Sequence, residues 1–259
     1  MSMASPGAAV TVSLALAGVL GYAWTCRHVA GRSVQPDNRR ANSAYAVAWG
    51  ALAVSLATDA ARLSAAFIAI PVEVYVALMQ AKIIAMAAAL VGFAVYVAAL
   101  YAGRLRAARW WVAAGVVHGT YFLVGLQGSL PARIQVGTWA TRVELLGDAG
   151  APGGLATGLA VFFVPLLALA AAYGGLWRRM PDPALRRRAM SVIVSMFVFA
   201  VAGMVSGNPE VSPDGAAIPL ATAALAGAAW LSMWAFVFTA SDATGQPGSP
   251  PPRSPRARP

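Results

Sequence analysis

The sequence predicts an all-α membrane protein, a bundle of seven transmembrane helices with its N-terminus outside and its C-terminus in the cytoplasm. Three observations predict this class: composition, seven long apolar runs, and arginines confined to alternate connections. Of 259 residues, 59% are apolar and 11% are charged, whereas a soluble domain carries about 25% charged residues. The composition excludes an ordinary soluble enzyme and a disordered chain, and it indicates a polytopic membrane protein.

Seven apolar runs account for most of the chain. They cover residues 8–28, 43–66, 72–101, 110–130, 155–177, 189–206 and 216–239. Each is long enough to cross a hydrocarbon layer of about 30 Å as a helix, the sixth only just. The breaks between them are rich in glycine, proline and charge, as connections should be.

Arginine sets the orientation. The first, third and fifth connections and the C-terminal tail hold 15 of the 18 arginines. The even connections hold Arg133 and Arg142 together with acids. Positively charged connections stay in the cytoplasm, so the N-terminus is expected outside. The expected membrane is a bacterial-type inner (plasma) membrane. The net charge of +10 is then explained by the membrane topology. The expected partner is the lipid bilayer, and no nucleic-acid partner is expected.

Two segments outside the apolar runs have a character of their own. In the outer loop 131–154, RIQV and WATRVEL flank Gly137–Thr138. This alternation predicts either a β-hairpin turning at Gly-Thr or an irregular loop with Trp139 in the membrane interface. The chain is expected to divide into a transmembrane domain, 1–242, and a disordered, basic, proline-rich cytoplasmic tail, 243–259.

The sequence offers little for catalysis. Cys26 is the single cysteine and there are two histidines, so no disulfide, cysteine-built metal site or multi-haem centre is expected. No basic segment precedes the first run, so we expect no cleaved signal peptide. No fused catalytic domain is apparent either. We therefore expect no enzymatic activity, no cofactor and no metal site.

Charged groups at membrane depth are costly and call for partners. Lys82, the single lysine, lies about ten residues into the third run, or ~15 Å along a helix. Glu73 is nine residues away and points to the opposite side at 100° per residue, so Asp59 on the preceding run is the expected partner. The pair is either a structural ion pair or part of a ligand-facing or proton-linked site. Arg62, three residues after Asp59, is expected to form a local ion pair near the interface.

Further polar and aromatic residues complete the candidate ligand-binding set of Asp59, Lys82 and Glu73. Gln80 shares a helix face with Glu73. His118 lies mid-run with Tyr121 on its face, and its plainer interpretation is a neutral histidine bonded across the bundle. Trp230 and Trp234 lie one turn apart in the last run, where packing or interface anchoring is the plainer interpretation.

The chain resembles the seven-helix N-terminal sensor region of bacterial histidine kinases across residues 8–240. The resemblance rests on YVAALYAGRLR at the end of the third run, LWRRMPDPALRRRAM before the sixth, the loop 131–154 and IPLATAALAG opening the seventh. Dimerisation, phospho-acceptor and ATP-binding segments are absent from this sequence. The resemblance therefore implies a receptor-like module without kinase activity.

These observations together predict a receptor-like or sensory integral membrane protein. It would bind a small apolar or amphipathic ligand in the outer half of the bundle and signal through a cytoplasmic partner. The alternatives are a small-molecule or proton-linked transporter using Asp59 and Lys82, and a structural subunit of a membrane complex.

Overall fold

The computed structural model describes residues 5–31, 39–102, 105–127, 130–146, 154–207 and 211–244. Within them the chain is helical apart from one hairpin and the connections. Its α-helices are α1 (Pro6–Gly31), α2 (Arg39–Leu63), α3 (Val72–Ala102), α4 (Leu105–Gln127), α5 (Gly154–Arg179), α6 (Pro183–Gly207) and α7 (Ala217–Thr244). A short 3-10 turn, η2 (Ser64–Ala66), follows α2. Every predicted run corresponds to one helix.

Helix ends differ from the predicted runs by a few residues. The runs were defined by apolar residues alone, whereas the helices continue into flanking polar residues. α4 begins at Leu105, five residues before the predicted run. α6 begins at Pro183 because the Asp182 carboxylate accepts a hydrogen bond from the Ala184 N–H at 2.8 Å. An aspartate N-cap followed by proline is a standard helix start. Of the predicted tail 243–259, residues 243–244 close α7 and residues 245–259 lie outside the described residues.

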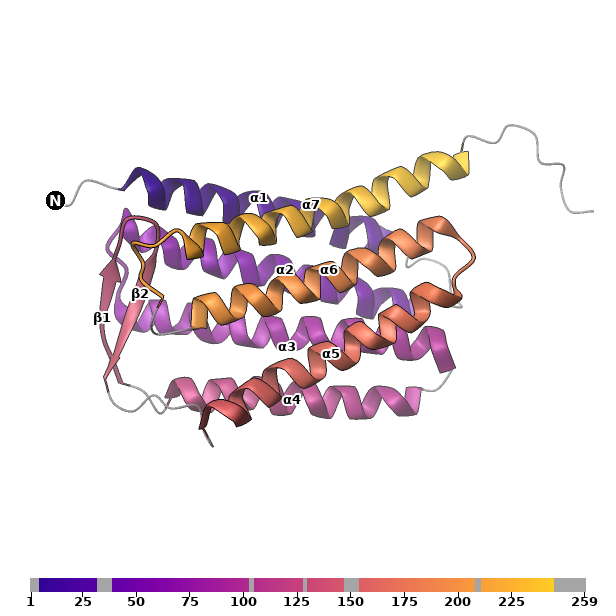
Figure 1. Cartoon of the computed structure of the whole chain (residues 1–259), viewed down its shortest axis with the longest axis horizontal. Coiled ribbons are helices and arrows are strands. Elements are labelled where there is room, and N and C mark those ends of the chain that lie inside the picture. The colour runs from indigo at the N-terminus through magenta and orange to yellow at the C-terminus, as the bar shows by residue number, and fades with distance from the viewer. Residues whose placement is uncertain are drawn as a thin grey trace, which may run out of the picture.

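The helices run alternately up and down the bundle. α1 begins, and α7 ends, at opposite ends of the molecule (Figure 1). α1 packs between α2 and α7, α6 packs between α5 and α7, and α3 contacts α2, α4 and α5. Consecutive helices are thus neighbours, as short connections require.

The surface and composition of the helices are those of a membrane protein. Five segments of the described chain are long and apolar enough to cross a membrane: Pro6–Gly31, Ala41–Ala66, Val72–Ala99, Ala160–Arg179 and Ala217–Val237. α4 and α6 are not among them. Large apolar side chains such as Leu20 and Phe197 are exposed on the outer faces, at 66% and 69%, which suits contact with lipid.

Aromatic side chains fill the middle of the bundle. Trp49 of α2 is fully buried and stacks on Tyr22 of α1, with ring centroids 5.7 Å apart, while Phe93 of α3 meets it edge-on at 4.9 Å. The Tyr22 hydroxyl donates to Ser195 Oγ on α6 at 3.3 Å. These contacts join four helices and leave one end of the bundle to be closed by the hairpin.

The segment between α4 and α5 contains the β-hairpin rather than the irregular alternative. β1 (Leu130–Val136) pairs antiparallel with β2 (Thr141–Leu146). The turn lies at Thr138–Trp139, one residue later than the predicted Gly137–Thr138, because the Gly137 N–H donates to the Ala140 carbonyl and pairs those residues. Glycine at 137 has another role: a Cβ there would lie 2.6 Å from the Pro213 carbonyl carbon.

Candidate functional site

A cavity of about 180 Å³ is lined by hairpin residues and by the parts of the helices near them. The hairpin lies at the end of the bundle where α1 begins (Figure 1). The cavity walls come from α2, α3, α6, α7, the hairpin and the segment before α7. The lining residues are Asp59, Arg62, Leu63, Tyr75, Met79, Lys82, Met86, Thr141, Arg142, Val143, Phe199, Ala202, Val205, Val211, Ile218, Ala221, Thr222 and Leu225. The cavity is therefore apolar over much of its wall, with charges gathered on one part.

Helical spacing places these side chains on common faces. Tyr75, Met79, Lys82 and Met86 follow one another at intervals of four, three and four residues along α3. Residues at such intervals share one side of a helix. Positions 218, 221, 222 and 225 do the same on α7, so each helix turns one continuous stripe towards the cavity.

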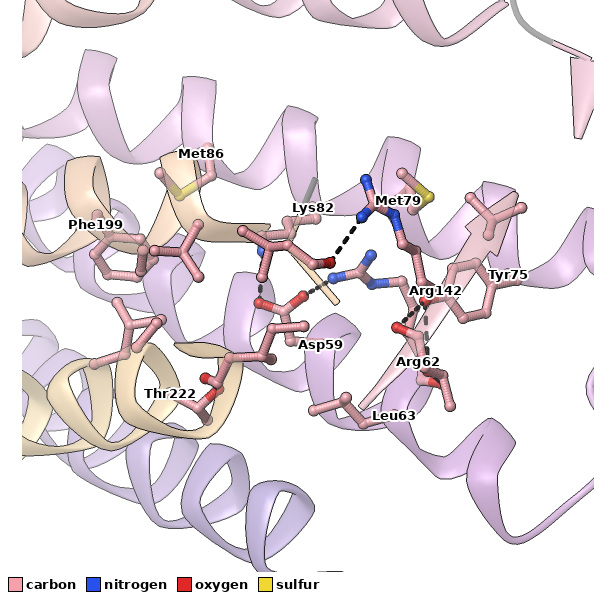
Figure 2. A pocket seen from close by; sticks show the side chains of 18 residues that line it. Asp59, Arg62, Leu63, Tyr75, Met79, Lys82, Met86, Arg142, Phe199 and Thr222 are labelled. Atoms are coloured by element: carbon pink, nitrogen blue, oxygen red, sulfur yellow. Dashed lines mark hydrogen bonds and ion pairs between the residues drawn. The ribbon is translucent and has the colours of Figure 1, made fainter. Parts of the chain in front are cut away.

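Asp59 is the centre of the charged part. Lys82 Nζ lies 2.7 Å from Asp59 Oδ2, and Arg62 Nη2 contacts the other oxygen, Oδ1. The prediction that Lys82 lies within salt-bridge reach of Asp59 is confirmed. Figure 2 shows the ammonium and the guanidinium reaching the carboxylate from different sides. All three side chains are largely buried, with 13–20% exposed.

Arg62 forms the expected local ion pair with Asp59, and its largely buried side chain also lies in the cavity wall. Its guanidinium carbon lies 5.5 Å from the centre of the Tyr75 ring, a cation–π contact. Its Nε is buried and has no hydrogen-bond partner among the described residues. Two cations therefore share one carboxylate.

The hairpin is tied to α2 and α3 by hydrogen bonds that involve Thr141. The Tyr75 hydroxyl donates to the Thr141 carbonyl at 2.9 Å, and Thr141 Oγ1 donates to the Arg62 carbonyl at 2.8 Å. Thr141 and Val143 are buried, at 7% and 5% exposure. Alternation along β2 turns these two towards the bundle.

The other side of the hairpin is tied to the segment before α7. The Trp139 N–H donates to the Pro213 carbonyl at 3.1 Å, and the Thr138 N–H donates to Asp214 Oδ1 at 2.7 Å. Arg142 Nη1 donates to the Val211 carbonyl at 2.9 Å. The hairpin thus closes the cavity between the ends of α2 and α3 and the start of α7.

The outward face of the hairpin carries a cross-strand ion pair between Arg133 and Glu144. The hydrogen bond from Arg133, together with its charge, lowers the pKa of the Glu144 carboxyl below its usual range. The Arg133 side chain is 72% exposed, and solvent screens such a pair. It supports strand register more than stability.

Of the sequence-predicted residues, the structure brings Asp59 and Lys82 together at the cavity, and the other six do not line it. Glu73 is exposed and Gln80 is half-buried. His118 is buried between α4 and α5, its Nδ1 3.1 Å from the Val161 carbonyl oxygen, which matches its plainer interpretation.

Tyr121 meets Phe122 edge-on within α4. Trp230 and Trp234 are exposed at 47% and 43%, and Trp234 lies 5.7 Å from the Arg187 guanidinium carbon. They lie on the outer surface of α7, away from the cavity.

Sequence reasoning missed Tyr75, Met79 and Met86, although their spacing from Lys82 could have identified them. It also missed Arg142 and Thr141, which reach the cavity only once the hairpin folds over the bundle. That placement depends on contacts with Val211 and Pro213, about 70 residues along the chain, and leaves no local signal.

The arrangement is suited to binding. Within the described ranges, no group of three or more histidine, cysteine, aspartate or glutamate side chains is placed to hold a metal ion. Apolar walls with a few convergent charges are typical of small-molecule sites. No protein-family profile matches this chain, and no curated protein matches it.

Proposed function

We propose that this chain is a receptor-like or sensory protein of a bacterial-type inner membrane. All seven helices span the bilayer, with the N-terminus outside and the C-terminus in the cytoplasm. A small apolar or amphipathic ligand binds in the cavity at the outer end, and a cytoplasmic partner receives the signal. The resemblance to histidine-kinase sensor regions supports the same role.

The cavity beneath the hairpin is the observation that carries this proposal. Its lining combines Lys82 and Asp59 with Met79, Met86 and Phe199, the mixture that holds amphipathic molecules. A ligand there would touch four helices and the hairpin at once. Since α6 and α7 run from the cavity to the opposite end of the bundle (Figure 1), a shift in their packing would reach the cytoplasmic side.

Native mass spectrometry of the purified full chain tests the proposal. We expect a small-molecule adduct on the wild-type protein, and its loss in Ala221→Phe, which fills the cavity from α7. Ala224→Phe, on an exposed position of the same helix, should keep the adduct. Absence of an adduct on the wild-type protein, or an adduct that Ala221→Phe retains, would contradict binding in this cavity.

A proton-linked carrier is the second candidate, favoured by the Asp59–Lys82 pair inside two apolar helices. Uptake into proteoliposomes separates the two functions. A sensor binds the co-purified molecule without moving it across the bilayer. A carrier accumulates it when a proton gradient is imposed, and Asp59→Asn abolishes that uptake.

A further inference from the structure

The charges that line the cavity do not balance. Among the described residues, three cations (Arg62, Lys82 and Arg142) and one carboxylate, Asp59, line it. Arg62 and Lys82 each contact a separate oxygen of Asp59, so this cluster alone carries one surplus positive charge. Two cations that share one carboxylate also repel each other. In a largely buried site, that surplus favours an anion.

Donor groups are also in excess. A lysine ammonium carries three N–H donors and a guanidinium carries five. Asp59 is the only ion-pair partner that the described residues provide for Lys82. The Nε of Arg62 is buried without a hydrogen-bond partner in the same part of the chain. An acceptor entering the cavity would therefore meet donors that the protein itself leaves unused.

The remaining walls and the volume limit the rest of the ligand. Met86 and Phe199 present apolar surface on one side of the charged residues, and Met79 adds apolar surface beside Arg142 (Figure 2). A cavity of about 150 Å³ accommodates benzene, and this one measures about 180 Å³. The apolar body of a ligand is thus limited to about six to ten non-hydrogen atoms.

We propose that the cavity binds a small organic monoanion, a carboxylate with an apolar body about the size of a benzene ring. The carboxylate is held by Lys82 and Arg62, and the apolar body lies against Met79, Met86 and Phe199. A single negative charge matches the surplus of the Asp59 cluster. This inference rests on the proposed function, because it specifies the ligand class of the same cavity.

Three probes of matched size and different charge test the ligand class: benzoate, benzyl alcohol and benzylamine. Binding to the full chain in lipid nanodiscs is measured by calorimetry, and inorganic phosphate serves as an anion without an apolar body. Specific binding is the part that Ala221→Phe removes and Ala224→Phe retains. We expect benzoate to bind about tenfold more tightly than benzyl alcohol, because one charge-assisted bond is worth that factor. Benzylamine and phosphate should bind more weakly still.

Variants assign the preference to its residues. Lys82→Met keeps the side-chain length and leaves Asp59 paired with Arg62, so benzoate should lose its advantage over benzyl alcohol. Lys82→Arg should retain it. Arg142→Gln tests the hairpin cation independently of the Asp59 cluster and should also reduce the advantage. Arg133→Gln removes an exposed cation of the same hairpin and should leave binding unchanged.

The outcomes separate the two proposals. Equal binding of benzoate and benzyl alcohol, lost in Ala221→Phe, would overturn the anion preference while leaving a ligand cavity. Phosphate binding as tightly as benzoate would overturn the need for an apolar body. Benzoate binding that Ala221→Phe does not reduce would overturn the cavity as the site, and with it the proposed function.

Discussion

At the scale of single residues, Asp59 is the group on which the charged cluster depends. It faces both Lys82 and Arg62, so its removal leaves two cations together in a largely buried site. Removal of Lys82 instead leaves a neutral Asp59–Arg62 pair. The three residues are therefore unequal, although a list of ion pairs treats them alike.

We predict that Asp59→Asn destabilises the protein far more than Lys82→Met. Loss of one partner from a buried pair costs about 3–5 kcal/mol when a charge is left uncompensated. Lys82→Met should cost about 1 kcal/mol or less, because Arg62 then balances Asp59 and an apolar side chain replaces the ammonium. Unfolding titrations in detergent micelles measure the difference.

The triple variant Asp59→Asn, Arg62→Gln, Lys82→Met is the control. It removes every charge of the cluster and should recover much of the stability that Asp59→Asn loses. If Lys82→Met destabilises as strongly as Asp59→Asn, Arg62 does not compensate Asp59 in the way its contact implies.

At the scale of helices, small residues decide how closely neighbours approach. A Cβ at Gly92 of α3 would lie 2.6 Å from the Ala44 carbonyl oxygen of α2, closer than atoms tolerate. A Cβ at Gly227 of α7 would meet nothing within 4 Å. Two glycines in apolar helices thus differ in purpose: one permits backbone contact and the other does not.

We predict opposite effects for alanine at these two positions. Gly92→Ala should separate α2 from α3 and destabilise the protein by about 1–3 kcal/mol, as overpacking does. Gly227→Ala should be neutral or stabilising by up to about 1 kcal/mol, since alanine is the better helix former. Thermal unfolding of both variants in the same detergent checks this. Equal losses would mean that α7 has a neighbour at Gly227 that the described residues do not supply.

The hairpin is an element whose position depends on a few hydrogen bonds. Tyr75 Oη supplies one of them, to the Thr141 carbonyl. Tyr75→Phe removes that bond, worth about 1 kcal/mol, while the ring remains. We predict faster hydrogen exchange of the amides in 130–146 and weaker retention of any cavity ligand.

Tyr96→Phe is the matched control. Tyr96 lies on α3, as Tyr75 does, but away from the hairpin, and its ring stacks on Tyr45 of α2. It should leave exchange in 130–146 unchanged. Unchanged exchange in Tyr75→Phe would mean that the contacts of Thr138 and Trp139 with the segment before α7 hold the hairpin without help from α3.

For the whole molecule, the sequence predicted what local patterns encode. Each helix corresponds to an apolar run, and the alternation around residue 137 indicated the hairpin as one of two alternatives. The Lys82–Asp59 pair was predictable by exclusion, because Lys82 had few acids within reach at its depth. Each of these inferences needs only spacing along the chain and the cost of charge in an apolar medium.

The cavity was not predictable in the same way. Which faces of α3 and α7 meet across the bundle depends on packing between segments far apart in the chain. Arg62 was expected to pair with Asp59, and it does, but its contact with the Tyr75 ring depends on how α2 and α3 pack. His118, Trp230 and Trp234 have the chemistry of site residues, and only their placement shows that they do not line this cavity.

The two ends of the bundle differ in charge, and this difference predicts which end lies outside. The hairpin and the connection between α5 and α6 lie at opposite ends (Figure 1), and five arginines (178, 179, 186, 187 and 188) flank that connection. Positive charge is retained in the cytoplasm, so the hairpin and its cavity should face outward. Single cysteines at Val136 and Pro181, both exposed, test this in a Cys26→Ala background.

In intact cells, an impermeant maleimide should label Val136→Cys and spare Pro181→Cys. Permeabilised cells should label both, which shows that each thiol is reactive once reached. The asymmetry follows from the cost of moving clustered guanidinium groups across the bilayer during insertion. Labelling of Pro181→Cys alone in intact cells would mean that the protein has the opposite orientation in the membrane. The cavity would then open to the cytoplasm, and its anion would have to come from inside the cell.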